Sequence, residues 1–377
     1  MKIALVSPWS VSARSVGGTE RFIVDLAESL VKRDHDVDVL MFSGVNYVAN
    51  NVNYISLDLL GKAVSVDEYK LRNELGDFSV LSTYAKLASR IESMVDSSKY
   101  DVMQINTQLL LLAWPNARKI FTVHTNPFEY KQAWGDCSYG KMVEITQGVA
   151  TSDNVTFTAP SRHYAELFSD AIQANVTFIP HAIDVSRVIS HTTKAELALR
   201  YDLDVSKLHI LLPSRLEPVQ KQPDLLFNAL QYLPEEWLNK IEILSSGVDA
   251  QYRGYQHKFT KQANDLGCSV FFGRFDYMSD AYQLADVVVL PSQSESFGYS
   301  ALESLSLGIP TILNDIPTFH EIADGHPSAR FFRGDSMELS NILQSIVESG
   351  VVRMKADSDW ADRYSLQRWV KQYEELM

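Results

Sequence analysis

Short apolar runs and amphipathic segments alternate along most of this chain. Runs at 2–7, 37–42 and 102–105 have the length and composition of buried strands. Residues 20–32 and 66–97 carry apolar side chains at helical spacing. Strands that alternate with helices form parallel sheets through right-handed crossovers, so this pattern predicts an α/β protein with doubly wound sheets.

The clearest strand–helix–strand unit begins with the apolar run Val287–Leu290, a predicted strand. A polar loop at 292–296 follows, then a predicted helix over Tyr299–Leu307, and Thr311–Leu313 is the next strand. In doubly wound sheets, ligands bind at the carboxyl ends of strands and at the start of the helix that follows. The loop at 292–296 is therefore the first candidate binding segment.

Two glutamates, Glu295 and Glu303, lie eight positions apart in this unit. Eight residues span about 12 Å on a helix, whereas the carboxylate pairs of glycoside hydrolases stand roughly 5 to 9.5 Å apart. Two separate contacts to one elongated ligand fit this spacing better, and two solvated surface glutamates are the plain alternative. Between them, Phe297, Gly298 and Tyr299 offer backbone N–H groups to an anionic or hydroxyl-rich group.

Two more polar loops follow predicted strands. After the predicted strand at 209–213, Arg215 and Lys221 could converge on one anion. The guanidinium would form a bidentate contact with two phosphate oxygens, and the ammonium would act as a point charge. Two solvated cations are the alternative. The pair Gly17 and Gly18 before the first helix would let a ligand approach the backbone, although a plain turn explains a glycine pair equally well.

His124 follows the predicted strand that begins at Ile120. An isolated histidine is more often structural than functional. The carboxyl end of a strand in a doubly wound sheet is nevertheless where ligand-binding groups lie. We therefore include His124 among the candidate site residues, as a hydrogen-bonding and charge-stabilising group.

The segment Glu295-Ser-Phe-Gly-x4-Glu303, followed by Gly308-Ile-Pro310, resembles the E-x7-E signature of retaining glycosyltransferases of the GT-B fold, family 4 type. In that family the first glutamate contacts the donor sugar and the second holds the ribose hydroxyls of the nucleotide. Ser304 replaces the usual alanine, and Gln222 stands where the family commonly has glycine.

Three other segments resemble the same family. Gly17-Gly18-x-Glu is similar to its glycine loop, Val-His124-x-Asn to its histidine segment, and Arg215-Leu-x4-Lys221 to its diphosphate grip. The resemblance implies a retaining, metal-independent, hexosyl-type transferase. Such an enzyme moves a sugar from a nucleoside-diphosphate sugar, with UDP-sugar favoured, to a hydroxyl of a glycan, glycolipid or small-molecule glycoside. No cofactor is implied beyond the donor substrate.

The resemblance also implies the architecture, two Rossmann-like domains that face each other across a cleft. Residues 1–190 would form the acceptor-side domain, with a C-terminal helix at 362–377 crossing back onto it, and 191–361 would bind the nucleotide sugar. The loop after the strand at 270–272 would line the base. The implied catalytic residues are His124, Arg215, Lys221 and Glu295, and the implied donor-binding residues are Gly17, Gly18, Arg274, Phe275, Phe297, Gly298, Tyr299 and Glu303.

Composition agrees with a soluble two-domain protein: 377 residues, 46% hydrophobic and 21% charged. No apolar run is long enough to span a membrane, and the first residues read as a strand rather than a secretion signal, so we expect a cytoplasmic protein with reduced cysteines. The net charge of −13 argues against a nucleic acid polymer as partner. The chain has no dense Lys/Arg cluster of the kind that binds anionic lipid, so its charge pattern does not indicate peripheral membrane contact.

One rival function keeps the fold, a non-catalytic accessory subunit that binds sugar nucleotides. The presence of His124, Arg215, Lys221 and Glu295 together argues against a decayed site. A sugar-nucleotide epimerase or hydrolase would be expected to carry further site acids or histidines. A nicotinamide oxidoreductase is excluded by the missing G-x-G-x-x-G fingerprint.

Overall fold

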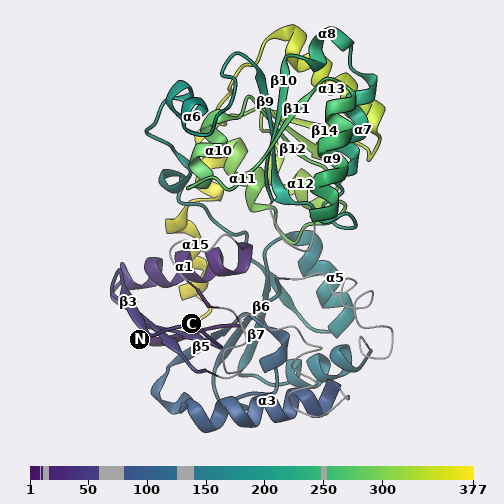
Figure 1. Cartoon of the computed structure of the whole chain (residues 1–377). Helices are drawn as coiled ribbons and strands as arrows, with labels where there is room; N and C mark the ends of the chain where they lie inside the picture. The colour runs from purple at the N-terminus through teal and green to yellow at the C-terminus, as the bar shows by residue number, and fades with distance from the viewer. Residues whose placement is uncertain (9, 12–16, 59–79, 125–139, 248–252) are drawn as a thin grey trace. The chain divides into compact units, whose positions relative to one another are not determined.

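The computed structural model describes residues 1–8, 10–11, 17–58, 80–124, 140–247 and 253–377. These form two units (Figure 1): unit 1 holds Met1–Ala182 and Tyr364–Met377, and unit 2 holds Ile183–Arg363. The two units divide between Ala182 and Ile183, whereas the sequence-based division was between residues 190 and 191. The C-terminal segment that returns to unit 1 begins at Tyr364, two residues after the expected 362.

The sheet of unit 1 has eight strands in the order β3-β4-β2-β1-β5-β6-β7-β8. All neighbouring pairs are parallel except β3 with β4. The strands are β1 Lys2–Ser7, β2 Asp36–Met41, β3 Tyr47–Ala49, β4 Val52–Ser56, β5 Val102–Ile105, β6 Lys119–Thr122, β7 Val155–Ala159 and β8 Val176–Phe178.

Helices cover both faces of this sheet. One face packs against α3, α5 and the helical residues 140–150, and the other packs against α1 and α15. Besides the helical residues 140–150, the helices described in unit 1 are α1 Gly18–Val31, α3 Val80–Met94, η1 Ser97–Lys99, η2 Gln108–Leu110, α5 Arg162–Ile172 and α15 Leu366–Glu374.

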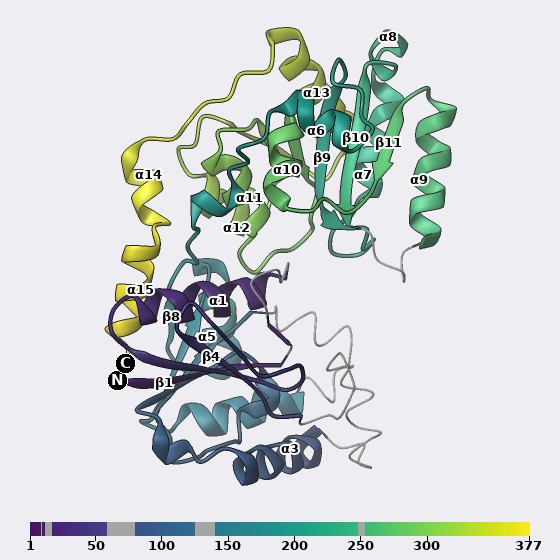
Figure 2. The ribbon, with the colours of Figure 1, turned by 60° about the vertical axis from the view of Figure 1, so that its left-hand side comes forward.

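The C-terminal helix α15 packs on unit 1 beside α1 (Figure 2). Its apolar stripe contains Trp369 and Tyr373, whose rings lie 5.4 and 5.7 Å from that of Phe22. On its polar side, Glu374 accepts a 2.6 Å hydrogen bond from Nε of Arg33. The returning helix that the resemblance implied is therefore confirmed, and the amphipathic pattern of the sequence explains why it packs there.

Unit 2 contains a six-stranded parallel sheet in the order β11-β10-β9-β12-β13-β14. Helices α7, α9 and α13 cover one face, and α10 and α11 contact β9, β12 and β13 from the other (Figure 1). The strands are β9 Leu208–Arg215, β10 Ile241–Gly247, β11 Ser269–Phe272, β12 Val287–Leu290, β13 Thr311–Asn314 and β14 Ala329–Phe332. The helices are η3 Val185–Val188, α6 Lys194–Arg200, α7 Asp224–Ala229, η4 Leu230–Tyr232, α8 Glu235–Leu238, α9 Arg253–Asp265, α10 Met278–Leu284, α11 Tyr299–Ser306, α12 Pro317–Ala323, α13 Ser336–Ser349 and α14 Ser358–Arg363.

The hydrophobic pattern located most strands to within two residues, but it missed β3 and β14. β3 is a three-residue antiparallel edge strand, and β14 begins Ala-Arg with alternating exposure, so neither shows an apolar run. Part of the helix expected over 66–97 is α3, and its portion at 66–79 lies outside the described residues. No helix in the described ranges combines the length and apolar composition needed to span a membrane.

Candidate functional site

The carboxyl end of the sheet in unit 2 brings together the loops that follow β9 and β12, because these two strands are neighbours. Nζ of Lys221, in the first loop, lies 2.6 Å from Oε1 of Glu295, in the second. Ser292 Oγ donates to the same carboxylate oxygen at 2.8 Å. The side chains of Lys221 and Glu295 are only 15% and 14% exposed. Two of the predicted catalytic residues therefore form one half-buried ion pair.

The loop between Arg215 and Lys221 is held by a carboxylate that sequence reasoning did not single out. Glu217 accepts hydrogen bonds from the backbone N–H groups of Val219 at 2.9 Å, Gln220 at 2.5 Å and Lys221 at 3.3 Å. The turn Glu-Pro-Val-Gln was the available signal, because a carboxylate just before a turn commonly accepts N–H groups two or three residues on. Glu217 thus fixes the backbone that carries Lys221.

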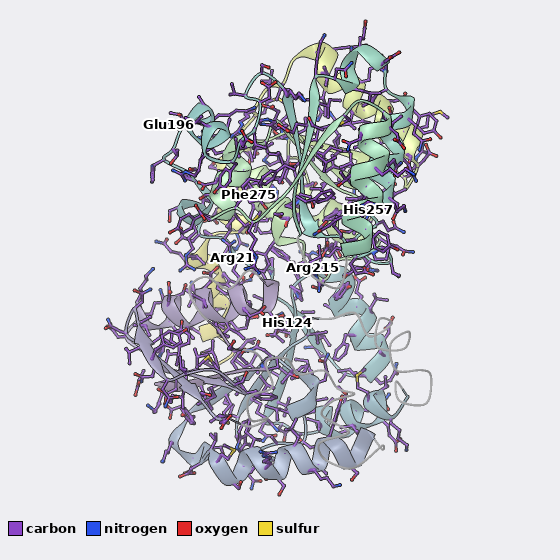
Figure 3. The ribbon with its side chains drawn as sticks, in the orientation of Figure 1. Arg21, His124, Glu196, Arg215, His257 and Phe275 are labelled. Carbon is purple, nitrogen blue, oxygen red and sulfur yellow. The ribbon has the colours of Figure 1, made fainter. Side chains whose placement is uncertain are left out.

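Gln220 joins the two loops. Its side-chain amide donates to the carbonyl of Ser294 at 3.2 Å, and its own carbonyl accepts the N–H of Gln293 at 2.7 Å. Arg215, the last residue of β9, is exposed at the end of the sheet (Figure 3). Two loops separated by more than 70 residues in the sequence therefore act as one rigid edge that bears Arg215, Lys221 and Glu295.

Gly298 is the N-cap of α11 and has a φ of +97°, a conformation that favours glycine. A Cβ atom built there would lie 2.9 Å from Cε1 of Phe319, so the ring of Phe319 leaves no room for a side chain at this position. Phe297 is buried, and its ring lies 5.3 Å from that of Tyr299. No side chain caps this helix start, and the sequence-based prediction that its N–H groups bind an anionic or hydroxyl-rich ligand stays a prediction.

Glu303 is buried within α11, with 5% of its surface exposed. The hydroxyl of Tyr282 donates to its Oε2 at 2.5 Å. Tyr282 belongs to α10 and is fully buried, so the tyrosine fixes the orientation of the carboxylate. The sequence identified Glu303 but gave no role to Tyr282, because only the fold brings α10 and α11 together.

Arg274 and Phe275 follow β11, two strands away from β9. Arg274 is exposed, whereas Phe275 packs at 5.0 Å against the ring of Tyr201 and at 5.3 Å against that of Phe271. Tyr201 in turn donates to Asp280 at 2.9 Å. Tyr201, Phe271 and Phe275 thus form an aromatic cluster at the end of β11, and Figure 3 labels Phe275.

The glycine pair of unit 1 forms the start of α1. Gly17 is the N-cap residue, and Gly18 is the first helical residue. A Cβ atom on Gly17 would lie 2.1 Å from Oε2 of Glu20, so a side chain there requires Glu20 to move. The Glu20 carboxylate therefore packs against Gly17, and the absence of a side chain at this position is what makes room for it.

His124 follows β6, where its Nε2 lies 3.0 Å from Oδ1 of Asn106. The amide nitrogen of Asn106 donates to the carbonyl of Val6 at 3.1 Å, so the oxygen faces the imidazole and His124 must donate from Nε2. Burial lowers the pKa of His124 to about 3. The ring lies 4.8 Å from that of Phe22 and 5.5 Å from that of His181. His124 is therefore a neutral imidazole with Nδ1 as an acceptor. Figure 3 shows its place in unit 1.

The predicted residues thus fall into groups, each described within its own unit. Arg215, Lys221 and Glu295 share one edge of unit 2, next to the helix start at Gly298. His124 and the glycine pair belong to unit 1. Across the described ranges, no three or more His, Cys, Asp or Glu side chains are arranged to hold a metal ion.

Comparison with known proteins places this geometry in a family. Residues 16–187 match the model of the domain described as "Glycosyltransferase Family 4", and residues 198–361 match that of "Glycosyl transferases group 1". An uncharacterised glycosyltransferase of Methanocaldococcus jannaschii is 25% identical over 340 residues, which is 85% of this chain and 82% of that protein.

Solved structures of the same fold cover the whole chain. Sucrose-phosphate synthase from Thermosynechococcus elongatus superposes with a TM-score of 0.77 at 18% identity, covering 100% of this chain and 98% of that one. HepE from Anabaena, solved in complex with UDP and glucose, gives 0.72 at 18% identity with the same coverage. The chain therefore belongs to the glycosyltransferases of the GT-B fold, family 4 type, which transfer a sugar from a nucleotide-sugar donor.

Proposed function

We propose that this chain is a retaining hexosyltransferase that moves a sugar from a UDP-sugar to a hydroxyl acceptor without a metal ion. The observation that carries the proposal is the Lys221–Glu295 pair at the carboxyl end of the unit 2 sheet. In this proposal Lys221 is the cation that binds the diphosphate, and Glu295 beside it is the hydrogen-bond acceptor for the sugar. The helix start at Gly298 adds backbone N–H groups to the same edge.

The chemical problem in this reaction is the loss of a diphosphate from the anomeric carbon. Negative charge grows on the leaving phosphate, and preorganised cations and N–H groups stabilise it by several kcal/mol. In this proposal Arg215 and Lys221 supply the positive charge that stabilises the leaving phosphate, a role that a metal ion would otherwise fill. Glu303, held by Tyr282, accepts the ribose hydroxyls, and Arg274 and Phe275 receive the base.

The roles of Glu295 and His124 follow from their hydrogen bonds. Oε1 of Glu295 accepts hydrogen bonds from Lys221 and Ser292, which lowers the nucleophilicity of this oxygen and suits a residue that orients the sugar. His124 is neutral and offers Nδ1 as an acceptor, so it would bind a sugar hydroxyl rather than donate a proton. Retention would then arise by attack on the same face that the phosphate leaves, with the phosphate taking the proton of the acceptor hydroxyl.

The choice of UDP rests on HepE, a protein of the same fold that binds UDP and glucose. The test is a thermal-shift screen of the full chain against UDP, GDP and ADP, followed by the corresponding sugar nucleotides. A ligand at 100 times its Kd should stabilise the protein by about 2.7 kcal/mol. We expect the largest shift with UDP and its sugars, unchanged by EDTA.

Donor turnover separates a transferase from a binding protein. Slow hydrolysis of the selected UDP-sugar, with the α-anomer of the sugar appearing first in an NMR time course, would support retention. Appearance of the β-anomer first would refute it. Loss of turnover in EDTA would refute metal independence. Tight binding without hydrolysis or transfer to any acceptor hydroxyl would favour the accessory-subunit function instead.

A further inference from the structure

A cavity lies in unit 1, at the edge of the sheet opposite to His124. It is lined by Lys119 and Val155, the first residues of the parallel strands β6 and β7, whereas His124 follows the last residue of β6. Its volume is about 400 Å³, within the range of small-molecule sites. None of the residues assigned to the transferase reaction lines it, so it is a separate site.

The walls of this cavity are largely apolar. Leu111 and Leu112 come from the segment after η2, and Ile145 and Val149 come from the helical residues 140–150. Near the opening, Lys141 and Glu144 form a 2.6 Å ion pair with each other, and their side chains are more than half exposed. The charges at the opening therefore offset one another.

Lys119 is the exception among these lining groups. It is 5% exposed, and its Nζ donates one hydrogen bond, to the carbonyl of Ala113 at 2.9 Å. An ammonium group has three N–H donors. Among the residues that the structure describes, Nζ of Lys119 has no second hydrogen-bond acceptor and no carboxylate within ion-pair distance, and the nearby charge of Glu92 offsets only part of the effect of burial on its pKa. A buried ammonium in this state attracts an anion strongly, because water no longer screens it.

The loop beside Lys119 holds an unfavourable backbone conformation. Trp114, next to Ala113, has a φ of +50°, which is uncommon for a bulky residue. Glu92 accepts the N–H of Trp114 at 2.6 Å, and the indole nitrogen donates to Val95 at 3.1 Å. These hydrogen bonds hold the loop in place. The carbonyl of Ala113 is thereby kept where it accepts the hydrogen bond from the Lys119 ammonium.

We propose that this cavity binds a small monoanionic amphiphile, a carboxylate with an apolar chain or ring, whose carboxylate pairs with Lys119. One buried ammonium that makes no ion pair and feels only the charge of Glu92 calls for one further negative charge. The apolar side chains call for an apolar body, and Glu144 at the opening disfavours a second anionic group. The site would serve an effector or stabilising ligand rather than the donor sugar.

The probe is sodium octanoate, titrated calorimetrically into the full chain at pH 7, with octanol and octylammonium as matched comparisons. We expect one saturable site for octanoate and at least tenfold weaker binding of both comparisons. Burial lowers the pKa of Lys119 to about 8, so octanoate affinity should fall steeply between pH 7 and pH 9.5 as the ammonium loses its proton.

Two variants test the role of the charge. Lys119→Met keeps the length and the apolar stem of the side chain, and it should lose at least tenfold in octanoate affinity. Lys141→Met removes the exposed cation at the opening and should change affinity less than threefold. As a measurement on the unmodified protein, octanoate should slow acetylation of Lys119 by an amine-reactive ester, followed by peptide mass spectrometry.

Three outcomes would overturn the proposal. Equal affinity for octanoate and octanol would mean that the cavity is a purely apolar site. Unchanged binding in a folded Lys119→Met protein would place the carboxylate elsewhere. Acetylation of Lys119 at the same rate with saturating octanoate would mean that the ligand does not reach the cavity.

Discussion

Lys221→Ala is the most informative single substitution, because it should change both stability and catalysis. The lost ammonium lies 2.6 Å from Glu295, and both side chains are about one-seventh exposed. Exposed pairs contribute 0–1 kcal/mol, and breaking a fully buried pair costs about 3–5 kcal/mol. Glu295 keeps its hydrogen bond from Ser292, so we expect an intermediate loss of about 1–2 kcal/mol in the free energy of unfolding.

The catalytic effect should be larger than the effect on stability. Removing one group that stabilises the charge developing in the transition state typically costs about 2.7–4 kcal/mol, or 10²–10³ in kcat. We therefore expect kcat/KM for the donor to fall at least a hundredfold in Lys221→Ala. Lys221→Arg, which keeps the charge, should recover part of that loss.

The assay combines urea unfolding with steady-state kinetics on Lys221→Ala, Glu295→Gln and the double variant. In unfolding, the double variant should be less destabilised than the sum of the single ones, because the two side chains form one pair. In kinetics, each single variant should remain strongly impaired. If Lys221→Ala lowers stability but leaves kcat/KM unchanged, the pair is only structural and Lys221 does not contact the diphosphate.

Three further predictions concern other parts of the site and the C-terminal helix. Gly298→Ala should lower the free energy of unfolding by about 1–3 kcal/mol, since alanine must adopt a φ of +97° with Cβ close to Phe319; unchanged urea unfolding would contradict this. The pKa of His124, lowered by burial to about 3, predicts no inflection from this residue between pH 5 and 8 in kcat/KM; an inflection that disappears in His124→Asn would refute it. The hydrogen bond from Arg33 lowers the pKa of Glu374, so this contribution to stability is present above the ordinary value of 4.5 and is lost as pH falls further. Glu374→Gln should therefore cost up to about 1 kcal/mol in urea unfolding at pH 7, and progressively less as the pH is lowered below 4.5. A loss that stays the same across this range would exclude the ion pair as its cause.

The sequence predicted those parts of the fold that local patterns determine. Val287–Leu290 is an uninterrupted apolar run and forms the predicted strand. The amphipathic tail forms the predicted helix α15, whereas its packing on the first domain was implied by the family resemblance. β14 could not be found in this way, because its alternating Ala-Arg-Phe-Phe residues lack a continuous apolar stretch. Its place in the sheet depends on pairing with β13, a contact that no local pattern reports.

The candidate site likewise contains residues that the sequence identified and residues that only the tertiary structure shows. Residues that would contact the ligand, such as Glu295 and Glu303, were identifiable because their spacing resembles a family signature. Their supports were not: Tyr282 lies 21 positions from Glu303, and Gln220 lies 74 positions from Ser294. These partners are determined by tertiary structure, and only the folded chain shows that each candidate carboxylate is held by a neighbour.

The hydrogen bonds that hold these loops also keep the Lys221–Glu295 ion pair in place at the edge of the sheet before any ligand binds. Lys221 and Glu295 have lost most of their contact with water in the described structure, so the cost of desolvating the ammonium is met during folding rather than during binding. Glu217 and Gln220 prevent the loops from relaxing towards solvent. A diphosphate that approaches this edge would meet a cation already positioned and largely dehydrated, and such preorganisation is what makes electrostatic stabilisation effective in catalysis.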